Sequence, residues 1–254
     1  MTDDPIALDL FNRWQFEPKS LISEGYCSKV FLDESRALKV PFQGEEQSSG
    51  LRAFLAYPES IRPKVYQFDE STGSILMERL MPGTILGDRS ISLETSTTVF
   101  TEAARTIANI EFDNPIPLTR YMERHGPLSK YMLETTEREV FLHGDLHHWN
   151  ILKHADGWKV IDAKGLFGDP AYEAAAFIMN PLDQLKEHTK DYTRHRIELL
   201  STATGCDAKR MLGWAILRFD PSESDKDSPC GFQHPILKQL AIEFGLAAEL
   251  IDLA

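Results

Sequence analysis

The 254-residue sequence is poor in cysteine and has no long apolar run. Its three cysteines, Cys27, Cys206 and Cys230, are widely spaced and form no CxxC pair, so we expect no disulfide framework. A transmembrane helix would need about 18 consecutive apolar residues, and the acidic N-terminus lacks the basic and apolar regions of a secretory signal. These absences predict a soluble cytoplasmic protein without a membrane partner.

Basic residues are also scarce relative to acidic ones. The chain has 27 Lys and Arg against 39 Asp and Glu, which gives a net charge of −12 with neutral histidine. Proteins that bind nucleic acid through its phosphates need clustered basic side chains, so we expect no nucleic-acid partner. The acidic excess is spread almost evenly, with 9 basic and 13 acidic residues in 1–80, 6 and 9 in 81–142, and 12 and 17 in 143–254. It therefore indicates solubility rather than a cationic ligand.

The hydrophobic pattern changes near residue 82. Before that point an N-terminal helix to about residue 14, a helix at 45–55 and several short β-prone runs are predicted. The β-prone runs are 21–23, 29–33, 37–42, 65–68 and 74–80. Later apolar residues recur at helical spacing, first in a helix from about 91 to 110 and then in another that ends near 137. We therefore expect an α+β, two-lobed chain, with a small antiparallel sheet lobe at residues 1–81 and a mainly helical lobe at 82–254.

The strongest chemical signal is the string His-Gly-Asp-Leu-His-His-Trp-Asn, from His143 to Asn150, followed twelve residues later by Asp162. Kinase catalytic loops have the form H-R-D-x-x-x-x-N with a second aspartate after the next strand, and the spacing here is the same. Phosphoryl transfer needs a carboxylate that accepts the proton of the attacking hydroxyl, and oxygen ligands for Mg²⁺. The string therefore predicts Asp145 as the base, and Asn150 and Asp162 as magnesium ligands.

Two other interpretations of this string are possible. Asp, Asn and Gly are common in turns, so Asp145 or Asn150 taken alone could simply shape a loop. His143 and His147 have the i, i+4 spacing of a zinc pair, but Gly144 and Asp145 do not favour the helix that such a pair requires. We expect His143 instead to brace the loop by positioning the Asp145 backbone.

This string and the segment VIDAKGLFGDPAYEAA (160–175) together resemble the aminoglycoside phosphotransferase superfamily, particularly the aminoglycoside/hydroxyurea antibiotic resistance kinases. HGDxxxxN alone would also admit choline, fructosamine and homoserine kinase-like enzymes. The resemblance covers mainly residues 140–180. It implies a two-lobed protein-kinase-like fold, ATP as the donor and a small hydroxylated acceptor, with an aminoglycoside such as streptomycin as the example that the resemblance offers. It also implies that Asp169, a natural N-cap before Pro170, helps to brace the catalytic loop.

Five residues of the first lobe are expected to contact the nucleotide. Lys39 lies on the third predicted strand, where the kinase lysine reaches the α- and β-phosphates. Gly25 and Ser28 belong to a turn with one glycine that could cover the phosphates. Glu78 and Leu80 lie in a stretch that resembles the family's hinge, where adenine would bond their backbone groups.

The helix after the third strand should supply an acidic partner for Lys39. Glu45 and Glu46 are both available, and a family-style alignment would place Gln47 there instead, so the partner stays open. In protein kinases an arginine at the position of Gly144 binds the phosphorylated activation loop. The glycine here therefore disfavours regulation by phosphorylation of such a loop.

Alternative functions share parts of this pattern. A catalytically inactive kinase-like module for nucleotide binding or sensing would keep the fold, but Lys39, Asp145, Asn150 and Asp162 are all present. A kinase of another hydroxylated metabolite would keep all four. The acidic stretch at 220–227 could bind the guanidinium groups of streptomycin, although its composition is more typical of a solvated loop. The sequence carries no signal for an oligomeric state.

Overall fold

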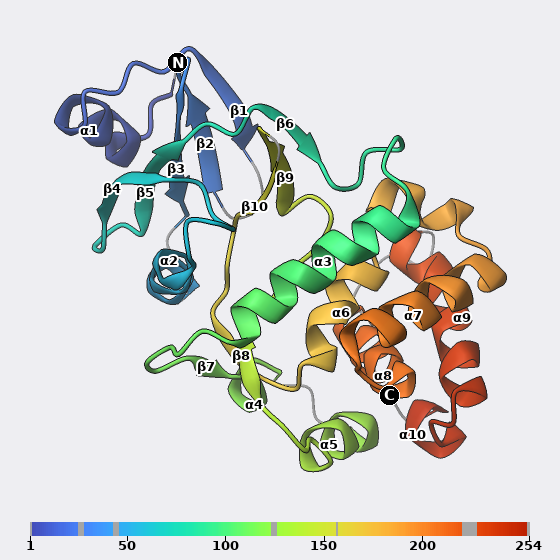
Figure 1. Cartoon of the computed structure of the whole chain (residues 1–254). Helices are drawn as coiled ribbons and strands as arrows, with labels where there is room; N and C mark the ends of the chain where they lie inside the picture. The colour runs from blue at the N-terminus through green and yellow to red at the C-terminus, as the bar shows by residue number, and fades with distance from the viewer. Residues whose placement is uncertain are drawn as a thin grey trace. The chain divides into compact units, whose positions relative to one another are not determined.

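The computed structural model describes the chain in six stretches, residues 2–24, 28–42, 46–122, 126–155, 157–219 and 228–252. The chain divides into two compact units, each of which is described by itself (Figure 1). The first contains Met1–Thr84 and Leu152–Gly165, and the second contains Ile85–Ile151 and Leu166–Ala254. The first unit therefore extends beyond residue 81 and includes a later piece of the chain, which we expected in the second lobe.

The first unit is built on a five-stranded antiparallel sheet. In spatial order its strands are β1 (Ser20–Glu24), β2 (Ser28–Leu32), β3 (Arg36–Pro41), β5 (Ser74–Glu78) and β4 (Val65–Asp69). Asp33 closes the turn between β2 and β3, because its carboxylate accepts the backbone N–H groups of Ser35 at 2.8 Å and Arg36 at 2.6 Å. Lys39 pairs in register with Val30 on β2 and Ile75 on β5, so it lies on the central strand.

Two helices belong to this unit, α1 (Pro5–Arg13) and α2 (Glu46–Ala56). The α1 helix begins where the Asp4 side chain accepts the N–H groups of Ile6 and Ala7, with Pro5 in the first turn. Its apolar face joins the sheet in one core cluster, formed by Ala7, Leu10, Trp14, Phe16, Phe31, Leu38, Val40 and Leu76. Burial of this face explains why so short a helix is stable.

A three-stranded sheet forms where the chain leaves the first unit and returns to it. Its order is β10 (Gly157–Val160), β9 (Ile151–His154) and β6 (Pro82–Ile85). The backbone N–H of Ala155 donates to the Met81 carbonyl at 2.9 Å, just beyond the paired strands. This sheet carries the chain toward Asp162.

The second unit is mainly helical. Its helices are α3 (Leu93–Ala108), α4 (Leu118–Tyr121), α5 (Pro127–Glu134), α6 (Ala171–Ile178), the 3₁₀ helix η1 (Leu182–Glu187), α7 (Lys190–Thr204), α8 (Ala208–Arg218), α9 (Pro229–Glu243) and α10 (Ala248–Asp252). A small sheet has the order β7 (Ile116–Pro117), β11 (Leu166–Gly168) and β8 (Val140–Leu142). In the antiparallel pairing of β8 with β11, Leu142, which precedes the 143–150 loop, lies opposite Leu166, and Gly168, which leads to α6, lies opposite Val140.

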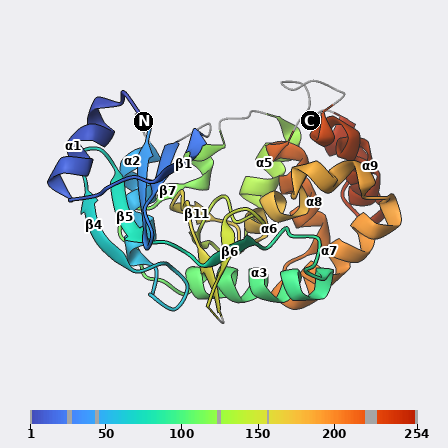
Figure 2. The ribbon, with the colours of Figure 1, turned by 90° about the horizontal axis from the view of Figure 1, so that it is seen from above.

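The α6 helix forms the core of the second unit. All eight of its residues are buried, as expected of a helix that is apolar on every side. Its only charged residue is Glu173. The α8 helix packs against α6 and lies beside it in both Figure 1 and Figure 2. A charge in this position must be matched by hydrogen bonds, since an unpaired buried carboxylate is costly.

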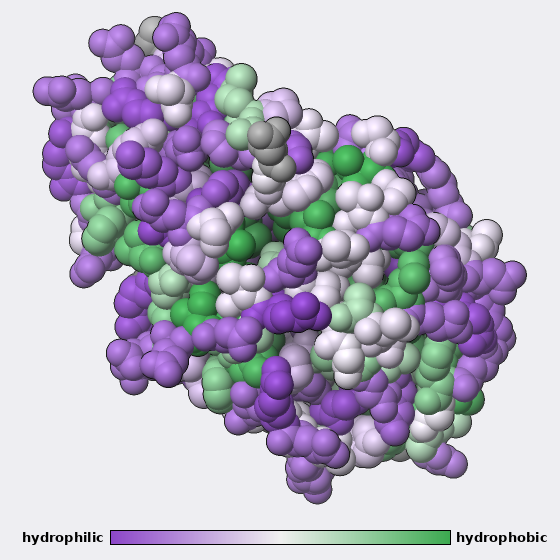
Figure 3. Space-filling view, in the orientation of Figure 1, coloured by the Kyte–Doolittle hydropathy of each residue, from purple (hydrophilic) through white to green (hydrophobic). Residues whose placement is uncertain are grey.

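The face of the molecule in Figure 3 is mostly hydrophilic. On the face in Figure 3 the apolar residues form small patches separated by polar ones. Among the described residues, no helix combines the length and apolar character needed to cross a bilayer.

Candidate active site

The loop between β8 and β9 brings Asp145 and Asn150 together in the second unit. The Asn150 side-chain amide donates to the Asp145 backbone carbonyl at 2.9 Å, and the Asn150 backbone N–H donates to the His147 carbonyl at 2.9 Å. Asn150 is buried, whereas the Asp145 side chain keeps 25% of its surface exposed. The loop is thus closed on itself, with the Asp145 carboxylate accessible.

His143 makes the bracing contact that we expected. It is fully buried, and its Nδ1 accepts the Asp145 backbone N–H at 3.1 Å. Between them Gly144 has a φ of +85°, a left-handed conformation that favours glycine over the arginine of protein kinases. Nowhere in the described stretches do three His, Cys, Asp or Glu side chains form a group that could hold a metal ion, so the zinc interpretation has no support.

Glu173 on α6 holds the same loop from beneath, and the sequence analysis missed it. Its carboxylate accepts the backbone N–H groups of His143 at 2.6 Å, Gly144 at 3.1 Å and Leu146 at 3.3 Å. Burial raises the pKa of Glu173 to about 7, although these N–H groups favour its charged form. The signal in the sequence was a single acid in an otherwise apolar helix.

Asp169 has a different role from the one that the resemblance implied. Its Oδ1 accepts the Ala171 backbone N–H at 2.9 Å, while its Oδ2 accepts Arg210 Nε at 2.7 Å and Trp214 Nε1 at 2.8 Å. Asp169 therefore ties the start of α6 to α8, and none of these contacts is to the 143–150 loop. Asp169 also caps α6 as expected, because its Oδ1 accepts the Ala171 N–H, and Pro170 has the helical φ of −58° and ψ of −25° of the first helical position.

Arg218, the last residue of α8, contacts the Asp145 carboxylate directly. Its guanidinium donates to Asp145 Oδ1, to the Gly144 carbonyl at 2.6 Å and to the Tyr172 hydroxyl at 3.0 Å. Burial alone would lower the pKa of Arg218, but Tyr172 and Asp145 raise it, so the guanidinium stays charged. This contact could not be predicted from local sequence patterns, because Arg218 follows Asp145 by 73 positions.

The third histidine of the loop, His148, is anchored as well. His148 stacks on Phe177, with ring centroids 3.9 Å apart, and its Nε2 lies 3.1 Å from a guanidinium nitrogen of Arg196. The same buried guanidinium donates to the carbonyls of Phe177 and Asn180, each at 2.6 Å. Burial lowers the pKa of His148 well below its ordinary value, so the ring is neutral and serves packing rather than proton transfer.

In the first unit the structure brings Lys39 and Asp162 together. The Lys39 ammonium on β3 forms an ion pair with Asp162, which follows β10. Asp162 has a φ of +67°, a left-handed conformation that is strained for a residue with a side chain. Such strain persists only where the surroundings enforce it, and it often marks functional positions.

The α2 helix packs against the backbone that follows Asp162. A Cβ atom on Gly50 would lie only 2.6 Å from the Ala163 carbonyl oxygen, so this close approach requires glycine. Gly165 has a φ of +77°, and its Cβ would lie 2.8 Å from that of Ala53. The helix therefore fixes the backbone on which Asp162 is carried.

The structure describes some of the other residues that were predicted to bind the nucleotide. Ser28 is buried at the start of β2, and Leu80 is half-buried just after β5. The Glu78 backbone N–H donates to the Lys64 carbonyl at 2.8 Å, and its carboxylate lies 3.4 Å from His154 Nε2. Four of the residues named above are not described in full. Gly25 and Glu45 lie outside the described residues, and the side chains of Glu46 and Gln47 lie outside the described side chains.

Comparison with known proteins finds relatives among the aminoglycoside kinases. The model of the family described as aminoglycoside/hydroxyurea antibiotic resistance kinase matches residues 99–224. The chain is 22% identical to streptomycin 6-kinase of Streptomyces glaucescens, over 83% of this chain and 78% of that protein. It is 33% identical to streptomycin 3''-kinase of Klebsiella pneumoniae, over 39% of this chain and 42% of that protein. The chain is thus similar to the aminoglycoside phosphotransferases. The protein is a small-molecule kinase.

Solved structures confirm the predicted two-lobed, protein-kinase-like α+β fold of this phosphotransferase. Aminoglycoside phosphotransferase APH(3'')-Id from Streptomyces rimosus, in complex with ADP and streptomycin, matches with a TM-score of 0.58 at 14% identity, over 85% of this chain and 98% of that one. A choline/ethanolamine kinase family protein from Mesorhizobium loti matches with a TM-score of 0.62 at 12% identity, over 92% and 90%. At such low identities the likeness concerns the fold.

Proposed function

We propose that this phosphotransferase transfers the γ-phosphate of ATP to a hydroxyl group of an aminoglycoside, with streptomycin as the first candidate. The observation that carries the proposal is the fixed, partly exposed carboxylate of Asp145. Its loop is held by His143, Glu173 and Arg218, which together satisfy four backbone N–H groups and orient Oδ1. A catalytic group that is held in position before the reaction is the main contribution that a protein makes to phosphoryl transfer.

Asp145 is assigned the role of general base. Arg218 bonds Oδ1, so we assign Oδ2 to the acceptor hydroxyl, whose proton it would receive as the hydroxyl oxygen attacks. Arg218 itself acts as a positioning residue, because its contacts are to Asp145, Gly144 and Tyr172.

Asn150 and Asp162 have the right chemistry for magnesium. Mg²⁺ takes oxygen ligands and needs only one or two from the protein, with substrate phosphates and water supplying the others. The Asn150 amide nitrogen is engaged by the Asp145 carbonyl, which leaves the amide oxygen as its metal-binding atom. Asp162 offers a carboxylate that is 39% exposed. When bound, Mg²⁺ would neutralise charge on the β- and γ-phosphates.

The first unit is assigned the nucleotide. Lys39 would neutralise the α- and β-phosphates, and its pairing with Asp162 supports this by holding the ammonium extended from the central strand. Gly25 and Ser28 would cover the phosphates. Because the Glu78 N–H is engaged by Lys64, we assign adenine to the Glu78 carbonyl and the Leu80 N–H.

The choice of acceptor rests on the relatives, which are named streptomycin 6-kinase and streptomycin 3''-kinase. The acidic stretch at 220–227 lies outside the described residues, and its suggested role in guanidinium binding stays a prediction. The test is ADP release by the purified protein with Mg-ATP and, in turn, streptomycin, hygromycin B and choline. Release with streptomycin, with the phosphate located by NMR, would support the proposal. Binding of Mg-ATP without turnover on any acceptor would favour the inactive nucleotide-binding module.

A further inference from the structure

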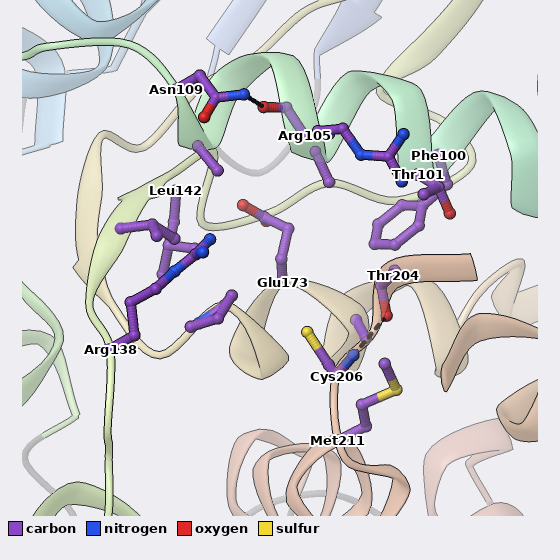
Figure 4. Close-up of a pocket in the computed structure, with 15 residues that line it drawn as sticks. Phe100, Thr101, Arg105, Asn109, Arg138, Leu142, Glu173, Thr204, Cys206 and Met211 are labelled. Carbon is purple, nitrogen blue, oxygen red and sulfur yellow. Dashed lines mark hydrogen bonds between the residues drawn. The ribbon is translucent and has the colours of Figure 1, made fainter. Parts of the chain in front are cut away.

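A cavity of about 350 Å³ opens in the second unit between α3, the segment leading into β8, the start of α6, and the end of α7 with the start of α8 (Figure 4). We propose that it binds a small organic anion, an apolar body that carries one carboxylate. None of its lining residues is among those assigned to ATP, magnesium or the acceptor hydroxyl. The volume lies at the lower end of the range for small-molecule sites.

The inner wall of the cavity is largely apolar. The side chains that provide it are Phe100, Ala104, Ala108, Val140, Leu142 and Met211. An aliphatic or aromatic body would remove this surface from water, which is the main source of affinity in pockets of this kind. The apolar wall therefore determines the body of the ligand.

Two arginines determine its charge. Arg105 on α3 and Arg138 before β8 both line the cavity, and both are exposed. Figure 4 shows the Arg138 side chain, from the segment before β8, ending beside Leu142, and the Arg105 side chain extending along α3 toward Phe100 and Thr101. Across the described part of the chain neither has a carboxylate partner, and the hydrogen bond of Arg105 is to the Ala203 carbonyl at 3.3 Å. Two guanidinium groups without counter-charges make the wall electropositive, which favours an anionic ligand.

Glu173 also forms part of the wall, and this fixes the orientation of the ligand. Its carboxylate is engaged by the N–H groups of the 143–150 loop, so its negative charge lies at the α6 side of the cavity. An anion would avoid that side. The carboxylate of the ligand therefore belongs at an arginine-lined part of the wall, away from Glu173, and its body belongs against the apolar residues.

The test uses 2-naphthoate as the probe and 2-naphthamide as its neutral match, titrated into the full-length protein by isothermal calorimetry. We expect the carboxylate to bind and the amide to bind at least about tenfold more weakly, because the amide has no charge to pair with the arginines. Arg138→Gln and Arg105→Gln should each weaken naphthoate about tenfold. The control is Arg120→Gln, an exposed arginine outside the cavity, which should bind like the wild type.

Kinase turnover separates this proposal from the proposed function. Arg138→Gln should keep the wild-type rate, because Arg138 is not among the residues assigned to catalysis. The proposal is overturned if naphthoate fails to bind at millimolar concentration, if acid and amide bind equally, or if both arginine variants bind like Arg120→Gln. Absence of kinase activity would leave these binding results unaffected.

Discussion

Arg218 is the contact through which α8 reaches the proposed base. Its replacement in Arg218→Gln removes the charge beside Asp145 and one bond to the Gly144 carbonyl. We expect kcat to fall about 100-fold, because a misplaced catalytic group costs that much, while KM for ATP changes little. Steady-state kinetics with the best acceptor measure both values.

Arg218→Lys is the matched variant for this prediction. It keeps the positive charge but cannot bond Asp145, Gly144 and Tyr172 at once, so it should recover only part of the rate. A kcat unchanged in Arg218→Gln would show that Asp145 does not depend on this guanidinium.

Glu173 gives the stability of the protein a specific pH dependence. Burial raises its pKa from 4.5 to about 7, so the folded protein holds this proton more tightly than the unfolded chain. Its contribution is therefore fully present below about pH 4.5 and is lost as the pH rises to about 7, by roughly 3 kcal/mol. Relative to Glu173→Gln, the free energy of unfolding should fall across this window. Urea unfolding at several pH values measures it, and a pH-independent difference between the two proteins would contradict the account.

At the scale of residues, contacts within the short motif could be predicted from the sequence. Contacts that distant residues make with the same loop could not. The contact of His143 with the Asp145 backbone was predicted because two positions separate them, and it is confirmed. Glu173 and Arg218 bond the same loop from helices 28 and 73 positions after Asp145, and periodicity carries no information about such pairs. The roles of Asp145 and its partners in catalysis stay predictions.

At the scale of elements, the close packing of α2 against the backbone after Asp162 depends on Gly50. Gly50→Ala would place a methyl group 2.6 Å from the Ala163 carbonyl oxygen and displace the helix. We expect a loss of about 1–3 kcal/mol in the free energy of unfolding and a higher KM for ATP. Chemical denaturation and kinetics measure these.

Gly157→Ala on β10 is the control for this prediction. Its Cβ would lie 3.9 Å from the His154 carbonyl oxygen, an ordinary contact, so both values should stay close to those of the wild type. Equal effects of the two substitutions would mean that helix packing at Gly50 is not the cause.

Most elements could be predicted because their periodicity is local. The five expected β-prone runs coincide with β1 to β5, and the helices expected at 45–55 and 91–110 are found as α2 and α3. The single helix expected to end near 137 is instead the separate helices α4 and α5, with Pro127 in the first turn of α5. The strands β7, β8 and β11 have two or three residues each, too few to show a period.

At the scale of the whole molecule, the proposed reaction draws on residues from both units. Lys39 and Asp162 belong to the first unit, and Asp145 and Asn150 belong to the second. The family match spans residues 99–224 and so includes all of these except Lys39, whose assignment rests on its strand and its pairing with Asp162. The net charge of the whole molecule does not indicate where a ligand binds, because the acidic excess is spread evenly along the chain.

The most direct test of the account is the behaviour of Asp145→Asn. This change keeps the size of the side chain but removes the base. We predict that turnover with Mg-ATP and the best acceptor falls by about 10²–10⁴-fold, the usual contribution of a general base, while calorimetry shows nearly unchanged binding of Mg-ATP. Turnover at the wild-type rate in Asp145→Asn would contradict the central claim.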